Sequence, residues 1–322
     1  MYVGENEDVE LELDHAPEED SVIAKRTPEG GWVVGYLSRD EDCENPLDDC
    51  EGCGKILDGR RLSATRDDYW AVRHDPDPLM HFLDVYSHSG DVWRVSGSGR
   101  YFPDEQWDVS RGAGLWVPDK EARVHILMTA AEEYANPQLF AAWREEIEAW
   151  KKAPRRSRGQ YPSRGASSLS IDSACHSEPT GRKNDRGYEI NRYWTTYGWR
   201  LGNRKRGGFK TVEAAVHAGL QAFAAAKAKK RKKKTKYQRF VFDKARYDAL
   251  CLEEAYRCAT SAVDEYNNWL SGDCWGVCVE EFDAEGEPEA DGQDACWGYV
   301  GEEYAREELE SQVASYVVSD AE

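Results

Sequence analysis

Hydrophobic and polar positions alternate in several short runs in the first part of the chain. The runs at 31–38, 80–87, 91–97 and 112–118 are rich in β-branched and aromatic residues and are bounded by Gly, Pro, Asp or Ser. Alternation with this composition is typical of β-strands. We therefore predict that this part of the protein is built on a sheet.

The hydrophobic period becomes helical at Asp119 and is interrupted at Asn136-Pro137. Pro suits the first turn of a helix but not its interior, so the pattern predicts two successive helices that end near Ala153. Residues 154–187 are rich in Ser, Gly, Pro and Arg and have no apolar period. That composition predicts a flexible basic linker.

Two alternating runs follow at 188–194 and 196–202, and a Gly-rich turn leads from them into a helix with Thr211 as its N-cap. The module 188–239 is thus predicted as strand, strand, turn and helix. One helix face carries an apolar stripe at helical spacing, made of Val212, Val216, Leu220 and Phe223.

The last segment begins with a long helical stripe that runs from Tyr247 to Leu270 and stops at Ser271-Gly272. Two short strand-like runs then surround an acidic loop, and a final helix carries Ala305, Leu309, Val313 and Tyr316 on one face. The closing unit is therefore predicted as αββα.

These elements predict an α+β fold. We expect an antiparallel sheet with helices, a core formed by both flanks of the chain, and a small basic ββα insert. The expected parts are an acidic arm (1–24), the first part of the core (25–153), the insert (154–243) and the second part of the core (244–322). Because nine carboxylates fall in the first twenty residues, we expect the arm to be solvated and partly disordered, or else to serve as an acidic interaction tail.

The net charge of −19 conceals three blocks of very different charge. Residues 1–150 hold 14 basic and 34 acidic residues, residues 151–250 hold 26 and 7, and residues 251–322 hold 2 and 20. Clustered Lys and Arg neutralise phosphates and release counterions, which favours nucleic-acid binding by the middle block. The alternative is a solvated basic surface that docks on the acidic flanks of the same chain.

Aromatic residues alternate with arginines within the middle block. The rings are Trp194, Tyr197 and Trp199, and the arginines are Arg192 and Arg200. One face of a sheet could therefore carry both rings and guanidiniums, although a packed sheet shows the same alternation.

The aromatic strands, the Arg204-Lys205-Arg206 turn and the phrase GGFKTVEAA (207–215) resemble the arm-type or AP2-like DNA-binding domain of phage integrases. In that family a three-stranded sheet backed by a helix enters the major groove. A third strand is not evident in this sequence, and Phe209 is expected in the core. The resemblance implies contacts to nucleic acid by Arg192, Trp194, Arg200, Arg204, Lys205, Arg206 and Lys210, with strand residues nearest the bases and turn residues on phosphates.

The flanks resemble a family of uncharacterised phage and mobile-element proteins. The phrases that carry this resemblance are DEDCENPLDD (40–49), YSHSG (86–90), WDVSRGAGLWV (107–117), YNNWLSGDCWGVCVEE (266–281) and DACWGYVGEEYA (294–305). The resemblance implies a phage or prophage origin and a shared α+β core. Its motif residues are Asn45, Pro46, His88, Ser89, Gly90, Gly272, Asp273, Trp275, Trp297 and Gly298.

The same flank phrases contain residues that could form a catalytic or metal site. His88 with Asp84, Asp91, Asp40 and Asp42 offers metal ligands or an acid and base, against a simple polar turn closed by His88, Ser89 and Gly90. Sequence motifs of the common enzyme classes are absent, so we expect a protein that is not an enzyme and has no cofactor.

A second candidate metal site is cysteine-based. Cys50 and Cys53 have the spacing of half a zinc knuckle, which Cys43 or the distant Cys175 and His176 would have to complete. Free thiols in an acidic loop are the favoured interpretation.

The N-terminus lacks the pattern of a signal peptide, no apolar stretch has the length of a membrane span, and nine Cys suit a reducing compartment. We therefore expect a protein of the host bacterial cytoplasm, with no membrane partner, that binds DNA or RNA through 188–239. The alternative function is phage anti-defence, in which the acidic flanks mimic DNA and occupy a host nuclease, restriction or CRISPR complex.

Overall fold

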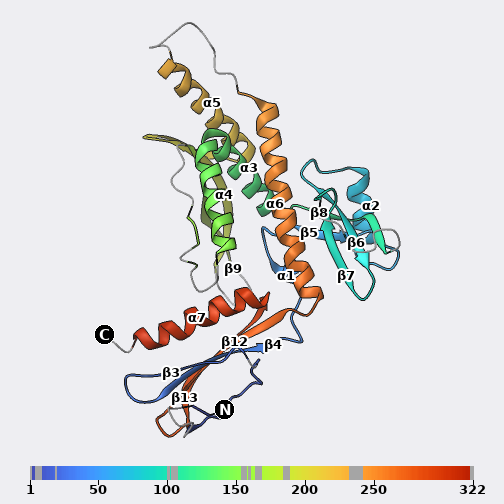
Figure 1. The fold of residues 1–322 in the computed structure, drawn as a ribbon. Coiled ribbons are helices and arrows are strands. Elements are labelled where there is room, and N and C mark those ends of the chain that lie inside the picture. Colours follow the sequence, from blue (N-terminus) through green and yellow to red (C-terminus); the bar gives the residue numbers. More distant parts are fainter. Residues whose placement is uncertain are drawn as a thin grey trace. The chain divides into compact units, whose positions relative to one another are not determined.

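The computed structural model describes residues 2–3, 9–18, 20–99, 102, 108–153, 158, 161–163, 169–183, 189–231 and 242–319 (Figure 1). All the strand pairs in this part of the chain are antiparallel, and helices pack on the sheets, which confirms the predicted α+β class.

The chain forms two compact units. Unit 1 comprises Met1–Asp75, His81–Val117 and Ala259–Glu322, and unit 2 comprises Pro76–Met80 and Pro118–Cys258. Unit 1 therefore draws on both flanks, while the helices predicted over 119–153 fall in unit 2 rather than in the flank core.

One sheet of unit 1 joins the two flanks of the chain. It contains β3 (Ile23–Arg26), β4 (Trp32–Arg39), β12 (Cys274–Phe282) and β13 (Pro288–Val300) in the order β13-β12-β4-β3. Strands β4 and β12 pair with Tyr36 opposite Cys278. The predicted αββα ending is confirmed, since α6 (Lys244–Leu270), β12, β13 and α7 (Glu302–Ser319) follow one another.

Helix α7 covers one face of this sheet (Figure 1). Its predicted stripe is buried there, with Leu309 and Val313 against strand residues such as Val33, Leu37 and Val277. The helix approaches β4 closely at Gly35, where a Cβ atom would lie 2.2 Å from Val313 Cγ2. Glycine is therefore required at this position by the packing of α7.

The other face of the same sheet packs against Leu11 and Leu13, which follow the short strands β1 (Tyr2–Val3) and β2 (Val9–Glu10) in the chain. Leu11 is 1% exposed and packs in a core with Val34, Tyr36, Cys278 and Phe282. Leu11 therefore anchors the described part of the expected acidic arm (1–24), which was predicted to be solvated and partly disordered, to the sheet. One buried leucine among carboxylates leaves no period that a sequence pattern would show.

The second sheet of unit 1 contains β5 (Lys55–Asp58), β6 (His81–Ser87), β7 (Asp91–Val95) and β8 (Val109–Val117) in the order β5-β8-β6-β7. The short helices α1 (Pro46–Asp49) and α2 (Arg66–His74) lie on the chain before and after β5. Asn267, near the end of α6, binds the edge strand β7. Its side-chain amide accepts from Trp93 N and donates to Trp93 O, both at 2.8 Å.

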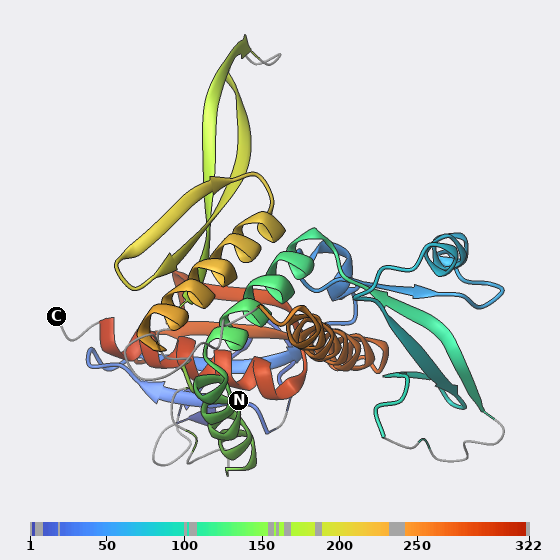
Figure 2. The ribbon, with the colours of Figure 1, turned by 90° about the horizontal axis from the view of Figure 1, so that it is seen from above.

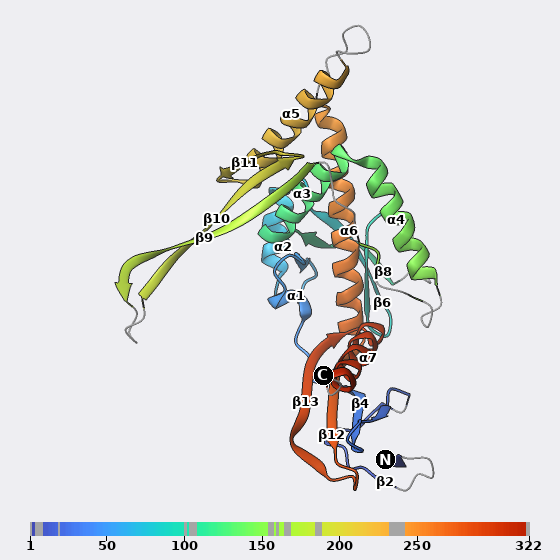
Figure 3. The ribbon, with the colours of Figure 1, turned by 90° about the vertical axis from the view of Figure 1, so that its left-hand side faces the viewer.

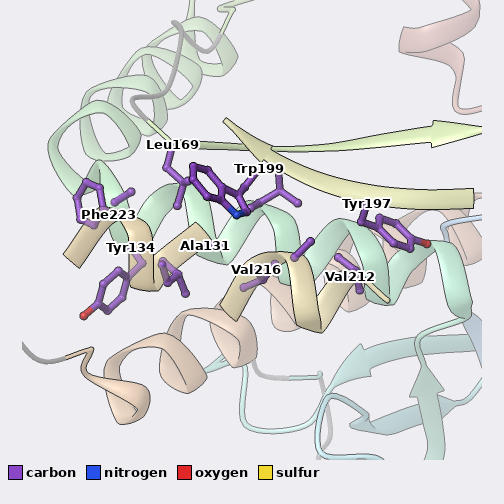
Figure 4. Packing of buried hydrophobic residues seen from close by; sticks show 12 residues of the cluster. Ala131, Tyr134, Leu169, Tyr197, Trp199, Val212, Val216 and Phe223 are labelled. Carbon is purple, nitrogen blue, oxygen red and sulfur yellow. The ribbon is translucent and has the colours of Figure 1, made fainter. Parts of the chain in front are cut away.

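Unit 2 contains α3 (Lys120–Ala135), α4 (Pro137–Lys152), β9 (Leu169–Lys183), β10 (Glu189–Leu201), β11 (Arg204–Phe209), α5 (Val212–Arg231) and the first part of α6. The break between α3 and α4 falls at Asn136-Pro137, as predicted. Strands β9 to β11 form a sheet in the order β11-β10-β9, and α5 packs on it. Figure 4 shows Leu169 and Trp199 of the sheet, Val216 of α5, and Ala131 and Tyr134 of α3 in one core.

Three predictions for this region are wrong. Residues 169–183, predicted as linker, form β9; the runs 188–194 and 196–202 belong to the single strand β10; and the Arg204-Lys205-Arg206 turn begins strand β11. Among the β9 residues whose burial is described, Leu169 and Ile171 are the buried apolar ones. The alternation of buried and exposed positions among these residues is therefore confined to the start of β9. The rest of the strand has the polar composition of a linker. Most of the remaining predicted linker, including 154–157 and 184–187, lies outside the described residues.

Candidate nucleic-acid interface

The three-stranded sheet of unit 2 has one face packed on α5 and one outer face. Tyr197 and Trp199 point to the α5 side and are each 8% exposed. Because strand residues alternate between faces, Arg192, Trp194 and Arg200 lie on the opposite, outer face, where all three are exposed. The rings predicted to share one face with the guanidiniums are therefore divided: Trp194 is on the outer face and the other two are in the core.

Trp194 stacks on a histidine of the neighbouring strand. Its ring centroid is 5.5 Å from that of His176, which lies directly opposite in the register, and the two planes are 21° from parallel. His176 Nε2 lies 2.7 Å from Thr196 Oγ1, and this hydrogen bond fixes the imidazole. Trp194 is still 39% exposed, so part of the indole is available to stack on a base.

The outer-face arginines have only weak protein partners. Arg200 Nη2 lies 3.6 Å from Asp172 Oδ2, and both side chains are more than half exposed. Ion pairs of this kind contribute little in water, because solvent screens them. Arg192 lies opposite Glu178 in the register. The Arg200 guanidinium can therefore exchange its carboxylate for a phosphate at small cost.

The remaining predicted contact residues lie at one end of the sheet, on β11 and just after it. Lys205 pairs with Arg200 in the register and shares the outer face, whereas Arg204 and Arg206 pair with Leu201 and Trp199 on the other face. All three β11 cations and Lys210 are exposed. The structure thus gathers Arg192, Trp194, Arg200 and Lys205 on one surface, which we call the outer-face set.

Phe209 is half-buried against the unit 2 core, in agreement with the prediction that it is a core residue. Thr211 follows as the predicted N-cap of α5, and its Oγ1 accepts a hydrogen bond from Ala214 N at 3.3 Å. At the other end of α5, Lys227 Nζ lies 4.5 Å from the centroid of the Phe223 ring. Residues 232–241, which include most of the lysine-rich run, lie outside the described residues.

Strand β11 pairs with β10 only from Tyr197 to Leu201. The N-terminal part of β10, up to Thr196, therefore pairs with β9 alone. The resulting two-stranded ribbon extends past α5 (Figures 2 and 3). Residues 172–178 of β9 and 192–195 of β10 are exposed, including Tyr193 at 68%. A ribbon of two strands with both faces exposed has the width that the major groove of B-DNA admits.

The motif residues of the flanks have structural roles in unit 1. Asn45 Oδ1 accepts from Leu47 N and caps α1, in which Pro46 takes the first turn. Gly272 follows the end of α6 with φ of +71°. Asp273 Oδ1 accepts from Glu302 N at 3.1 Å, at the start of α7, and from Trp275 Nε1 at 2.6 Å.

Trp297 and Gly298 belong to β13 and have similar roles. The Trp297 ring covers Gly276 so closely that a Cβ atom there would lie 2.4 Å from it, and it meets His15 edge-on at 5.0 Å. Gly298 N donates to Asp40 Oδ2 at 3.0 Å. Trp107, the first residue of one motif phrase, lies outside the described residues.

His88, Ser89 and Gly90 form the turn between β6 and β7. His88 Nδ1 lies 3.0 Å from Asp108 Oδ2, and the side chain is 67% exposed. The carboxylates weighed as its partners are engaged elsewhere: Asp84 accepts from Ser96 Oγ and Gly112 N, and Asp91 pairs with Arg60. These residues do not meet at one point.

The ion pair of Arg60 with Asp91 is one of two that this arginine makes. Arg60 Nη2 lies 2.6 Å from both Asp58 Oδ2 and Asp91 Oδ2. Hydrogen bonding to Arg60, together with that from Ser87, holds the pKa of Asp91 below its ordinary value, although partial burial acts in the opposite direction. The arrangement joins β5 to the β6–β7 hairpin.

Cys50 and Cys53 form a disulfide, so the favoured prediction of free thiols is wrong for this pair. The two sulfurs are bonded to each other and are not available as zinc thiolates in this state. Cys43 is a free thiol whose Sγ lies 3.5 Å from Glu44 O, and Cys175 is an exposed free thiol of β9.

Comparison with known proteins found no matching family model, no matching curated protein and no matching solved structure. Among the described residues, no helix combines the length and the apolar composition needed to cross a membrane.

Proposed function

We propose that this chain is a phage or prophage accessory protein that binds DNA or RNA through residues 188–239 together with strand β9. The observation that carries the proposal is the outer-face set: three cations and a stacked indole on one exposed sheet surface. Cations neutralise phosphates and an indole stacks on a base, so one surface offers both contributions to single-strand or groove binding.

Strand β9 strengthens the proposal. With β9 the module has three antiparallel strands and a helix on one face, which is the arrangement that the resemblance to integrase arm-type domains implies. Strands β10 and β11 alone would leave the module one strand short of that arrangement. In the proposed mode the outer face and the ribbon contact nucleic acid, and α5 supports the sheet from behind. The proposed location is the host bacterial cytoplasm.

The test is a binding titration of the full-length chain against labelled single-stranded DNA, duplex DNA and RNA over a range of salt concentrations. The decisive variant is the triple substitution Arg192→Ala, Arg200→Ala and Lys205→Ala. If each cation meets one phosphate, the slope of log K against log salt falls by about two to three. Arg61→Ala, an exposed arginine of unit 1, is the matched control. Wild-type protein that does not bind at low salt, or a triple variant that binds like wild type, contradicts the proposal.

A second candidate function, inhibition of a host nuclease by DNA mimicry, is favoured by α7. Its outward face carries Glu303, Glu307 and Glu310, exposed and one turn apart. A regular row of carboxylates resembles a phosphate backbone in charge. This function predicts that the full-length chain inhibits DNA cleavage by a restriction or CRISPR nuclease, and that charge reversal of the three glutamates abolishes inhibition. The triple variant of the outer-face set would then inhibit as well as wild type.

A further inference from the structure

Three side chains with different metal-binding atoms meet in unit 2, away from the candidate interface. They are His125 of α3 and Glu254 and Cys258 of α6. Their ligand atoms all lie within 4.8 Å of one another, and His125 Nε2 is 3.4 Å from Glu254 Oε1. Among the described residues this is the one group of three or more such side chains that has this geometry.

The helices explain the convergence. Glu254 and Cys258 are one turn apart on α6, so both project from the same face. Helices α3 and α6 pack in the same core, in which Leu127 and Met128 of α3 lie with Tyr247 and Leu250 of α6. Tyr247 Oη also donates to Leu127 O at 3.2 Å. The backbones that carry the three ligands are therefore held together independently of any metal.

We propose that His125, Glu254 and Cys258 bind a divalent transition metal of the zinc class. Imidazole nitrogen, thiolate sulfur and carboxylate oxygen are the three ligand types of protein zinc sites. With metal–ligand distances of about 2.0–2.3 Å, tetrahedral ligands lie about 3.3–3.8 Å apart, so a small side-chain adjustment closes the observed group around an ion.

The surroundings of the group suit a metal site. Arg257 pairs with Glu254 through Oε2, which leaves Oε1, the atom facing His125, for the metal. A hydrogen-bonded partner on the second oxygen is the usual means of orienting a ligating carboxylate. The Arg257 charge is itself shared with Glu253, to which its Nη2 donates. The arginine is thus a positioning residue rather than a substitute for the ion.

The site has access to solvent and an open position. The side chain of His125 is 60% exposed, while that of Glu254 is only 11% exposed, so an ion enters past the imidazole. Binding displaces the Cys258 proton to solvent as the thiolate–metal bond forms. Three protein ligands leave the fourth tetrahedral position to water, the arrangement found in zinc sites that are not purely structural.

The test is a titration of the metal-free, full-length chain with Co²⁺ in the presence of a phosphine reductant. Cobalt reports its ligands directly, because a thiolate gives a charge-transfer band in the near ultraviolet and a four-coordinate ion gives intense visible bands. We expect both features to saturate at one equivalent of Co²⁺. Zn²⁺ should then displace the cobalt, since zinc binds such sites at least as tightly.

The variants identify the site. Cys258→Ser should remove the charge-transfer band, and His125→Ala and Glu254→Gln should each weaken Co²⁺ binding at least tenfold. Cys251→Ser, two turns earlier on the same helix, is the matched thiol control and should bind like wild type. The double variant Cys50→Ser and Cys53→Ser controls for thiols released by the reductant.

Several outcomes would overturn the proposal: no charge-transfer band in wild type, a band that persists in Cys258→Ser, or a band lost in the Cys50 and Cys53 double variant. Because His125 is exposed, its alanine variant should keep the wild-type circular dichroism spectrum, so weak cobalt binding by that variant cannot be attributed to unfolding.

Discussion

The indole of Trp194 stacks on the imidazole of His176 across strands β10 and β9, with ring centroids 5.5 Å apart. The contact holds the indole roughly in one orientation on an exposed surface. A preorganised ring loses less conformational entropy on binding than a free one, so this pair is the best candidate on the outer face for a base-stacking platform.

The first prediction tests this platform. Trp194→Ala should weaken binding to single-stranded nucleic acid by about 1–3 kcal/mol, the usual cost of losing one base–aromatic stack. Trp70→Ala is the matched control, because this indole of α2 is 42% exposed and belongs to unit 1, outside the candidate interface. Fluorescence anisotropy measures both. Equal losses in the two variants would show that the outer face is not the binding face.

The second prediction concerns Asn267, whose amide makes two hydrogen bonds with the backbone of Trp93. Asn267→Ala removes the side-chain partners of the backbone N–H and C=O of the buried Trp93 and should lower the free energy of unfolding by about 1–3 kcal/mol. Asn268→Ala, an exposed neighbour on the same helix, should stay within about 0.5 kcal/mol of wild type. Urea denaturation followed by tryptophan fluorescence gives both values, and equal values would contradict the role of Asn267.

The third prediction concerns the contact of α7 with β4. Gly35→Ala places a Cβ atom 2.2 Å from Val313 Cγ2 and 2.8 Å from Leu309 Cδ1. Overpacking of this kind should destabilise the protein by about 1–3 kcal/mol. Adding Val313→Ala should recover part of the lost free energy of unfolding. The double variant should therefore be more stable than the sum of the two single-variant effects predicts. A strictly additive cycle would show that α7 moves away instead.

The fourth prediction is a pH dependence. Arg60 and Ser87 hold the pKa of Asp91 below its ordinary value of 3.8, so Asp91 contributes stability above that pH and loses it as the pH falls through the lower folded-state pKa. At pH about 7, Asp91→Asn should lower the free energy of unfolding by about 1 kcal/mol. The difference from wild type should shrink at pH about 3. Asp67→Asn, an exposed carboxylate of α2, is the control, and an effect of Asp91→Asn that does not vary with pH would contradict this explanation.

Sequence patterns identified elements wherever one face is buried along most of their length. The predicted strands correspond to β4, β6, β7 and β8, and the helix stripe from Val212 to Phe223 is buried as expected. Strand β9 gives little sequence signal, because its residues 172–178 are exposed on both faces and show no period of two. The same pattern of exposure makes the ribbon a candidate binding element.

The candidate sites were predictable to different degrees. Arg192, Trp194 and Arg200 were found because they are close in sequence, and strand alternation places them on one face. The sequence suggests His176 only as a possible zinc ligand, since its stacking on Trp194 depends on the register of β9 with β10, which sequence patterns do not indicate. His125 meets Glu254 and Cys258 through the packing of two helices, a tertiary contact for which single-sequence patterns carry no signal.

The pairing of β4 with β12 sets an order of events during synthesis. Tyr36 and Glu280, hydrogen-bonded side chains of these strands, are 244 residues apart in the chain. At about 5–20 residues per second, the ribosome takes roughly 12–50 s to make the second strand after the first. All the strands and helices of unit 2 up to Cys258 are made in that interval. The apolar surface of β4 is thus exposed until its partner strand emerges, and the dense negative charge of the N-terminal flank is of the kind that opposes aggregation of such a surface.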